Sequence, residues 1–286
     1  MRVGLMFANG AQGAEPEHAA ALAIAAEAAG YESLWAVQHV VMPVAHASEY
    51  PYSGSGTVPG GQAIPIPDPL VWLAWAGALT SRILLGTGII VLPQQHPLVV
   101  AKQVATLDRL TGGRVILGVG AGWLREEYDA LDADFDSRGP RMDEDIEVLR
   151  RAWSPGPTAF TGRHVTFDPV HVEPTPAHRV PIHIGGHSPA AARRAGRLAD
   201  GFFPLSCQGE RLTQLVSTVR DAAVAAGRDP DAIEITADAP RTEEDADAQA
   251  AAGVSRIVVN APHVPKAELT GALGRLLGAA RRVVRA

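Results

Sequence analysis

The chain is short of several residue types, and each shortage excludes a class of protein. Cysteine occurs once in 286 residues, at Cys207, so no intramolecular disulfide can form and a reducing compartment is expected. The formal net charge is −6 and no long basic run appears, so the sequence shows no positively charged segment that would attract nucleic acid. No apolar stretch reaches the roughly 18 residues of a membrane helix, and the first residues lack the flanks of a signal peptide. We therefore expect a cytoplasmic protein whose partners include neither nucleic acid nor a membrane.

Hydrophobic residues are plentiful, and they form short strands that alternate with helical patterns. With 47% hydrophobic residues, the chain can bury the core of one large α/β domain spanning residues 1–286. Strands are expected at Val3–Ala8, Ser33–His39, Ile83–Pro93, Arg114–Gly122, Pro181–Gly186, Gly201–Leu205, Ile233–Ala237 and Arg256–Asn260. The helical patterns between them indicate parallel strands. Eight such units favour a closed (β/α)8 TIM barrel over an open doubly wound sheet.

Two segments interrupt this alternation. Val40–Pro67 follows the second strand and is far longer than a median loop of about 4 to 6 residues. Because it leaves the carboxyl end of a strand, it is expected at the rim where barrel active sites form. Tyr50, Tyr52 and several prolines favour an ordered lid there. Pro155–Val180, after the fourth strand, alternates polar and aromatic residues around Thr161–Gly162, which indicates a small inserted hairpin.

The fourth strand runs directly into a glycine loop. Gly118, Gly120 and Gly122 remove side chains where the chain leaves the sheet, so a flat or anionic ligand could approach the backbone. A dinucleotide-binding loop would look similar, but its pattern needs a glycine where Trp123 stands, and this unit lies in mid-chain. We take Gly120, Ala121 and Gly122 as candidate ligand contacts.

The fifth strand ends in a loop that can bind an anion. Gly185, Gly186, His187 and Ser188 precede Pro189, the first residue of an expected helix. Exposed amides at a helix N-terminus, the positive end of its dipole and a serine hydroxyl together suit a phosphate group. An ordinary helix cap is the alternative, since serine followed by proline is typical of helix starts.

His39 closes the second expected strand, at the end where polar residues of a barrel point into its site. A histidine there can exchange protons near neutral pH, although it could instead hydrogen-bond the lid backbone.

In the third strand, Gly86 and Gly88 interrupt an apolar run. Such glycines indicate a bulge, a ligand close to the backbone, or tight packing within the barrel.

Other chemistry finds little support in the sequence. His164, His171 and His178 recur every seven residues but lack the spacings of zinc motifs, so we predict no metal site. No G-x-S-x-G elbow of a hydrolase occurs. Glu126 and Glu127 are adjacent, so they lie on different faces of a helix and cannot act as a facing carboxylate pair.

The segments GVGAGWLREEY, GGHSPAAARRAG and LGTGIIVLP resemble the bacterial luciferase-like superfamily, most closely its oxidoreductases that use the deazaflavin coenzyme F420. The resemblance spans nearly the whole chain and implies a TIM barrel with a small insertion after strand four. It also implies a non-prolyl cis peptide between Gly88 and Ile89 against the cofactor ring, and a cofactor phosphate at the loop 185–188. His39 would contact the ring or relay a proton, whereas Gln38 stands where some relatives have an acidic residue.

The expected function is F420-dependent hydride transfer between C5 of the deazaflavin and a small-molecule organic substrate, with His39 as the catalytic residue. The sugar-phosphate dehydrogenases of the superfamily have a glutamate where Trp123 stands. That activity is therefore not expected, and an apolar or aromatic substrate is favoured. Two alternatives stay open, an FMN-dependent monooxygenase of the same fold and a catalytically silent flavin-binding barrel. A homodimer is left open as the assembly.

Overall fold

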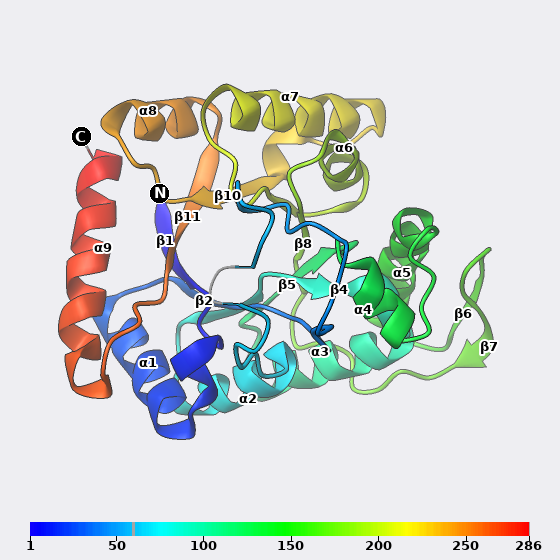
Figure 1. The fold of residues 1–286 in the computed structure, drawn as a ribbon. Coiled ribbons are helices and arrows are strands. Elements are labelled where there is room, and N and C mark those ends of the chain that lie inside the picture. Colours follow the sequence, from blue (N-terminus) through cyan, green and yellow to red (C-terminus); the bar gives the residue numbers. More distant parts are fainter. Residues whose placement is uncertain (59–60, 286) are drawn as a thin grey trace.

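Strands and helices alternate along the chain in the computed structural model, which describes residues 1–58 and 61–285 (Figure 1). The strands are β1 (Arg2–Met6), β2 (Ser33–Ala36), β3 (Leu84–Thr87), β4 (Ile90–Val91), β5 (Val115–Gly120), β6 (Thr158–Thr161), β7 (Thr166–Val170), β8 (Ile182–Gly185), β9 (Gly201–Phe203), β10 (Glu234–Asp238) and β11 (Val254–Asn260). The helices are α1 (Pro16–Ala29), α2 (Pro69–Leu79), α3 (Pro97–Thr111), α4 (Arg125–Ala130), α5 (Arg138–Ala152), α6 (Pro189–Leu198), α7 (Gly209–Ala225), α8 (Glu243–Ala251) and α9 (Leu269–Arg285). Among these described residues, none of the helices combines the length and the hydropathy needed to cross a membrane.

The strands close into a barrel. Each pairs in parallel with the next in the order β1, β2, β3, β5, β8, β9, β10 and β11, and β11 pairs with β1. Figure 1 shows the helices arranged around this barrel. The antiparallel hairpin of β6 and β7 falls between β5 and β8 in sequence and is a sheet of its own. The predicted TIM barrel with a small insertion after strand four is confirmed.

The second expected strand ends earlier than its sequence pattern suggests. β2 stops at Ala36 and not at His39. The reason is the Asn9 side chain, which replaces a neighbouring strand as the partner of Val37. Asn9 Oδ1 accepts from Val37 N at 2.8 Å, and Asn9 Nδ2 donates to Val37 O at 2.8 Å. His39 therefore lies just beyond the barrel wall, at the start of the lid.

The third expected strand, 83–93, is divided in two. A cis peptide between Gly88 and Ile89 separates β3 from β4, as the resemblance implied. Gly88 N donates to Ala36 O at 2.7 Å, so the chain still lies beside β2 at the break. After the break, β4 pairs with β5.

Glycines inside the barrel make room for bulky side chains. Trp35 is fully buried, and an added Cβ would lie 2.6 Å from its ring at Gly86 and 2.7 Å from its Nε1 at Gly4. In the same way, an added Cβ at Gly201 would lie 2.6 Å from the His183 ring. Tight packing within the barrel, one of the roles expected for Gly86, is the one that the structure supports.

A buried ion network occupies the amino end of the barrel. Arg256 is 1% exposed, binds Glu32 through Nε at 2.8 Å and Nη2 at 2.7 Å, and binds Glu234 through Nη1 at 2.9 Å. Its Cζ lies 5.6 Å from the centre of the Trp35 ring, a cation–π contact. His183 lies beside Glu234, and burial lowers the pKa of its imidazole to about 4. Because side chains fill this end, a site inside the barrel has to open at the carboxyl end.

Replacing Gly86 by alanine places a methyl group against the Trp35 ring. We expect the free energy of unfolding to fall by about 1–3 kcal/mol, the usual cost of overpacking a core. Urea denaturation followed by circular dichroism measures the change. Gly54→Ala is the matched control, because no atom of the described residues lies within 4 Å of its added Cβ. Equal stabilities of the two variants would contradict this description of the barrel interior.

Candidate functional site

Residues from separate units of the barrel come together at its carboxyl end. His39 follows β2, Trp123 follows β5 and His187 follows β8. The lid, defined as residues 40–67, runs across this end as the blue loop in Figure 1, and its residues 59 and 60 lie outside the described residues. Three of the positions that the sequence singled out therefore border one mouth.

His39 is held by a buried carboxylate to which the sequence analysis gave no role. Glu127, in the first turn of α4, is 1% exposed, and its Oε2 lies 3.1 Å from His39 Nδ1. Its other oxygen, Oε1, accepts from two lid amides, Val40 N at 2.7 Å and Val41 N at 3.3 Å. A carboxylate only accepts hydrogen bonds, so Nδ1 carries the hydrogen and Nε2 is left to take up or release a proton.

Glu126, the neighbouring residue of α4, holds a second part of the lid. Its Oε1 accepts from Ala47 N at 2.6 Å and from Ser48 N at 3.2 Å. Hydrogen bonding, above all from the Ser48 side chain, lowers the pKa of the Glu126 carboxyl to about 2. The two adjacent glutamates point in different directions, and for that reason they anchor different stretches of the lid.

Aromatic rings form a continuous chain across the mouth. The Trp123 ring centre lies 6.0 Å from that of His39 and 5.4 Å from that of Tyr50 in the lid. Tyr50 in turn lies 5.3 Å from Tyr52, and Tyr52 lies 4.9 Å from His187. All four contacts are edge-to-face, the favoured geometry for such pairs. The lid thus connects the histidine after β2 with the loop after β8.

The loop after β8 has the features of an anion site. Ser188 Oγ accepts from Ala191 N at 3.1 Å and caps α6, which confirms the predicted helix start. Arg211, from α7, donates to His187 O at 3.1 Å and adds a positive charge. Burial, followed by Arg211, lowers the pKa of His187, and in the described part of the chain its shielded Nδ1 has no hydrogen-bond partner. Beside a cation and a helix N-terminus, this nitrogen suits a phosphate in the tautomer in which it carries the hydrogen and can donate it.

The candidate glycines face protein atoms. The Ile89 side chain fills the space beside Gly120 and Gly185, where added Cβ atoms would lie 2.8 and 2.6 Å from it. Gly122 has a φ of +69°, which favours glycine, and its added Cβ would lie 2.7 Å from Val91. Packing and backbone conformation therefore account for these glycines without a ligand. Contacts with a cofactor stay predictions for Gly88, Ile89, Gly120, Ala121, Gly122, Gly185 and Gly186.

Asp238 is a residue of the mouth that sequence reasoning missed, because the expected strand ended one residue earlier. It is the last residue of β10, its Oδ2 accepts from Ser206 N at 2.6 Å, and burial raises its pKa. Burial, followed by Asp238, also raises the pKa of Tyr50 in the lid. The rule that polar residues at strand ends point into a barrel site would have found Asp238.

Gln38 and His178, one of the three regularly spaced histidines, have structural surroundings. Gln38 is buried, and its Oε1 accepts from Val91 N at 2.8 Å. His178 packs against Gly113, whose added Cβ would lie 1.9 Å from His178 Nδ1. Nowhere in residues 1–58 and 61–285 do three His, Cys, Asp or Glu side chains converge in a way that could hold a metal ion.

Comparison with known proteins gives the family. The sequence matches the luciferase-like monooxygenase family over residues 1–282, and the chain belongs to that family. An F420-dependent glucose-6-phosphate dehydrogenase from Nakamurella multipartita is 34% identical over 218 residues, which cover 74% of this chain and 60% of that protein. The predicted family membership is confirmed.

Two solved structures share the fold. Monooxygenase RslO1 from Streptomyces bottropensis superposes with a TM-score of 0.67 and 26% identity, covering 98% of this chain and 79% of its own. The coenzyme F420 dependent tetrahydromethanopterin reductase from Methanopyrus kandleri has a TM-score of 0.71 and 19% identity, with 96% of each chain covered. At that lower identity the likeness shows the fold alone.

Glu126→Ala tests the anchoring of the lid. The variant removes the acceptor for two lid amides, so we expect hydrogen exchange at Ala47 and Ser48 to become faster. Amide exchange followed by nuclear magnetic resonance measures it. Val40 and Val41 serve as internal controls, because they bind Glu127 and should exchange as before. Unchanged exchange at Ala47 and Ser48 would show that Glu126 does not hold the lid in solution.

Proposed function

We propose that this protein is an oxidoreductase that uses coenzyme F420 to transfer a hydride to or from a small organic substrate. The observation that carries the proposal is the pair of His39 and Glu127 beside Trp123, at the mouth of a barrel. The 34% identity to an F420-dependent dehydrogenase supports the choice of cofactor. When bound, F420 supplies the hydride donor or acceptor at its C5 carbon.

The residues of the mouth fit a planar cofactor with a phosphate-bearing tail. The loop of His187 and Ser188 offers the phosphate the N-terminus of α6 and the Nδ1 atom of His187, which has no hydrogen-bond partner among the described residues. Trp123 and His39 border the mouth on the other side and provide aromatic surface for a ring. The lid lies between these two parts, so one elongated ligand could contact both.

The roles of the protein side chains follow from their surroundings. His39 Nε2 takes up or releases the proton that is coupled to hydride transfer. Glu127 keeps the hydrogen on Nδ1 and fixes the orientation of the ring. Burial, followed by Tyr50, raises the pKa of Tyr52 to about 12, so the lid brings a neutral phenol to the mouth. Tyr52 therefore adds no charge to the mouth.

The surroundings of Trp123 favour an apolar or aromatic substrate. Its ring contacts His39, His46 and Tyr50, which makes this side of the mouth largely aromatic. By the resemblance, sugar-phosphate dehydrogenases of this superfamily have a glutamate at the position of Trp123. We therefore propose no activity on glucose 6-phosphate.

A monooxygenase that uses FMN is the second candidate. The observation that favours it is the likeness to monooxygenase RslO1, which is 26% identical and covers 98% of this chain.

Titration of the purified protein with F420 and FMN side by side distinguishes the two candidates. We expect F420 to bind more tightly. Tight binding of FMN with no binding of F420 would overturn our proposal in favour of the second candidate.

Ser188→Ala tests the phosphate position in the same titration. We expect F420 affinity to fall by about 1 kcal/mol or somewhat more, the scale of one hydrogen bond to a charged group. Unchanged affinity would place the phosphate elsewhere.

A screen of conjugated enones, nitroaromatics and alcohols with both redox states of F420 then looks for turnover. Binding without turnover of any of them would favour a catalytically silent barrel.

Turnover of a substrate found in that screen tests the roles of His39 and Glu127. His39→Ala should lower kcat by roughly 10² to 10⁴, the contribution of a positioned acid or base. Glu127→Gln should lower kcat by about 10- to 100-fold, because it replaces the charged acceptor of the His39 Nδ1 hydrogen bond by a neutral amide.

The matched control is Glu126→Gln, which alters the adjacent carboxylate and a lid anchor without touching His39. We expect it to change kcat by less than the Glu127 variant does. Equal losses in the two variants would show that Glu127 acts on turnover through the lid and not through the histidine.

A further inference from the structure

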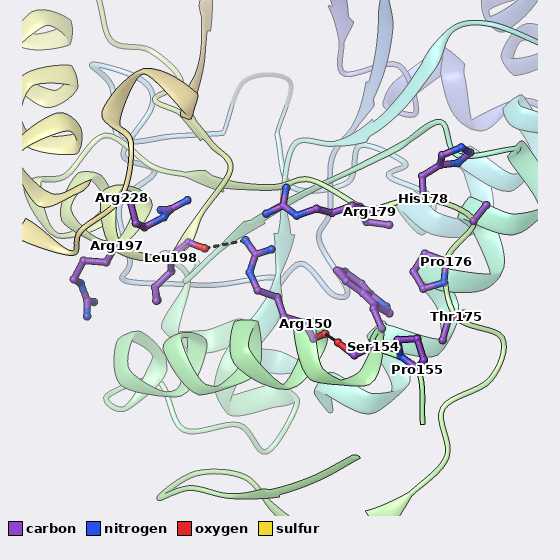
Figure 2. Close-up of a pocket in the computed structure, with 13 residues that line it drawn as sticks. Arg150, Ser154, Pro155, Thr175, Pro176, His178, Arg179, Arg197, Leu198 and Arg228 are labelled. Carbon is purple, nitrogen blue, oxygen red and sulfur yellow. Dashed lines mark hydrogen bonds between the residues drawn. The ribbon is translucent and has the colours of Figure 1, made fainter. Parts of the chain in front are cut away.

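A cavity of about 820 Å³ lies at the amino end of the barrel units, opposite the candidate site. Figure 2 shows it between the end of α5, the segment that leads into β8, and the end of α6. Both ends of the inserted segment 155–180 frame it. Ser154 and Pro155 lie where the insertion leaves the barrel, and Thr175–Val180 lie where it returns. A cavity of this size suits a small molecule.

One side of the cavity is strongly basic. Arg150, Arg179, Arg197 and Arg228 all line it (Figure 2). Arg150 and Arg179 share one carboxylate, Asp200, whose oxygens lie 3.0 and 2.5 Å from their Nη2 atoms. Burial lowers the pKa of Arg228, and the charges of Arg150 and Arg179 add to this effect although Asp200 opposes it. Arg197 is paired with Asp143, whose Oδ2 lies 2.8 Å from its Nη2. The four guanidinium groups thus have two carboxylate partners, Asp200 and Asp143, so positive charge exceeds negative charge on this side.

The arginines keep hydrogen-bond donors for a ligand. In the part of the chain that the structure describes, Arg150 donates hydrogen bonds only through Nη2, to Leu198 O and to Asp200. Arg179 likewise donates only through Nη2, to Asp200. Within the described residues, the Nε and Nη1 groups of these two arginines have no protein acceptor. Guanidinium groups with free N–H donors bind phosphate oxygens through strong, charge-assisted hydrogen bonds.

The wall formed by the returning insertion is fixed in place. Asp108, in α3, accepts through Oδ2 from Ala177 N at 2.8 Å and from His178 N at 3.2 Å. Arg109 Nε donates to Thr175 O at 2.8 Å. These contacts hold the segment before β8 against α3, so this wall of the cavity is preformed and a ligand would not have to order it.

Apolar residues also line the cavity. Trp153 lines it, and its Nε1 donates to Ala101 O at 3.0 Å, which fixes the indole. Pro155 and Pro176 lie on the same side, away from Arg197 and Arg228, as Figure 2 shows. The indole of Trp153, fixed by its hydrogen bond, offers a surface for a flat group.

We propose that this cavity binds a nucleotide-sized organic phosphate. The phosphate lies at the free donors of Arg150 and Arg179, and the planar part of the molecule lies against Trp153. This second site is independent of the cofactor and substrate of the candidate active site, since the two lie at opposite ends of the barrel units.

Isothermal titration with AMP, ribose 5-phosphate and inorganic phosphate tests the proposal on the intact protein. We expect AMP to bind at least ten-fold more tightly than inorganic phosphate, and more tightly than ribose 5-phosphate, which lacks the planar group. Arg179→Gln should weaken AMP binding by about ten-fold or more, the effect of losing a charged hydrogen bond. Arg179 is mostly exposed, so this variant should keep the fold.

Arg193→Gln is the matched control, because Arg193 is an exposed arginine of α6 that does not line this cavity. It should leave AMP affinity within about two-fold, whereas a nonspecific effect of net charge would weaken both variants alike. Ser188→Ala reports on the carboxyl-end loop and should leave AMP affinity unchanged. No binding of AMP at millimolar concentration, equal affinities for AMP and inorganic phosphate, or insensitivity to Arg179→Gln would overturn the proposal.

Discussion

The Glu127 carboxylate is the contact on which the arrangement of the mouth depends. A carboxylate buried this deeply has to be matched by hydrogen-bond donors, and its donors here are His39 Nδ1 and the amides of Val40 and Val41. One group therefore sets both the orientation of the histidine and the direction in which the lid leaves β2. Trp123, in the loop that precedes α4, packs edge-on against that histidine and against the lid tyrosine Tyr50.

The interior of the barrel explains why the mouth is at one end only. Bulky side chains, Trp35 and His183, occupy the spaces beside glycines in neighbouring strands. Below them, Arg256 satisfies its charge with Glu32 and Glu234 at the amino end. Replacing one partner of such a buried network would leave an uncompensated charge, which is strongly destabilising. The amino end of the barrel interior is thus committed to stability, and the loops at the carboxyl end are left to vary with the chemistry of the mouth.

The fold could be predicted from the sequence because its signals are local, namely apolar strands, helix caps and their alternation. The extent of β2 could not, because the residue that ends its pairing is Asn9, which lies in another unit. Glu127 was missed for the same reason, since its partner His39 is 88 residues away. The glycines show the limit of such reasoning. A glycine indicates that something lies close, whereas only the structure shows that the neighbour of Gly86 is Trp35 and that of Gly120 is Ile89.

The protonation of the His39 ring nitrogens tests most directly whether Glu127 positions this histidine. Protein labelled with ¹⁵N-histidine gives separate resonances for Nδ1 and Nε2, and comparison with His39→Gln identifies those of His39. We predict that, in the neutral ring, Nδ1 carries the hydrogen and Nε2 does not, because Glu127 accepts at Nδ1. A neutral ring with its hydrogen on Nε2 would contradict this, and would mean that Glu127 serves the lid alone.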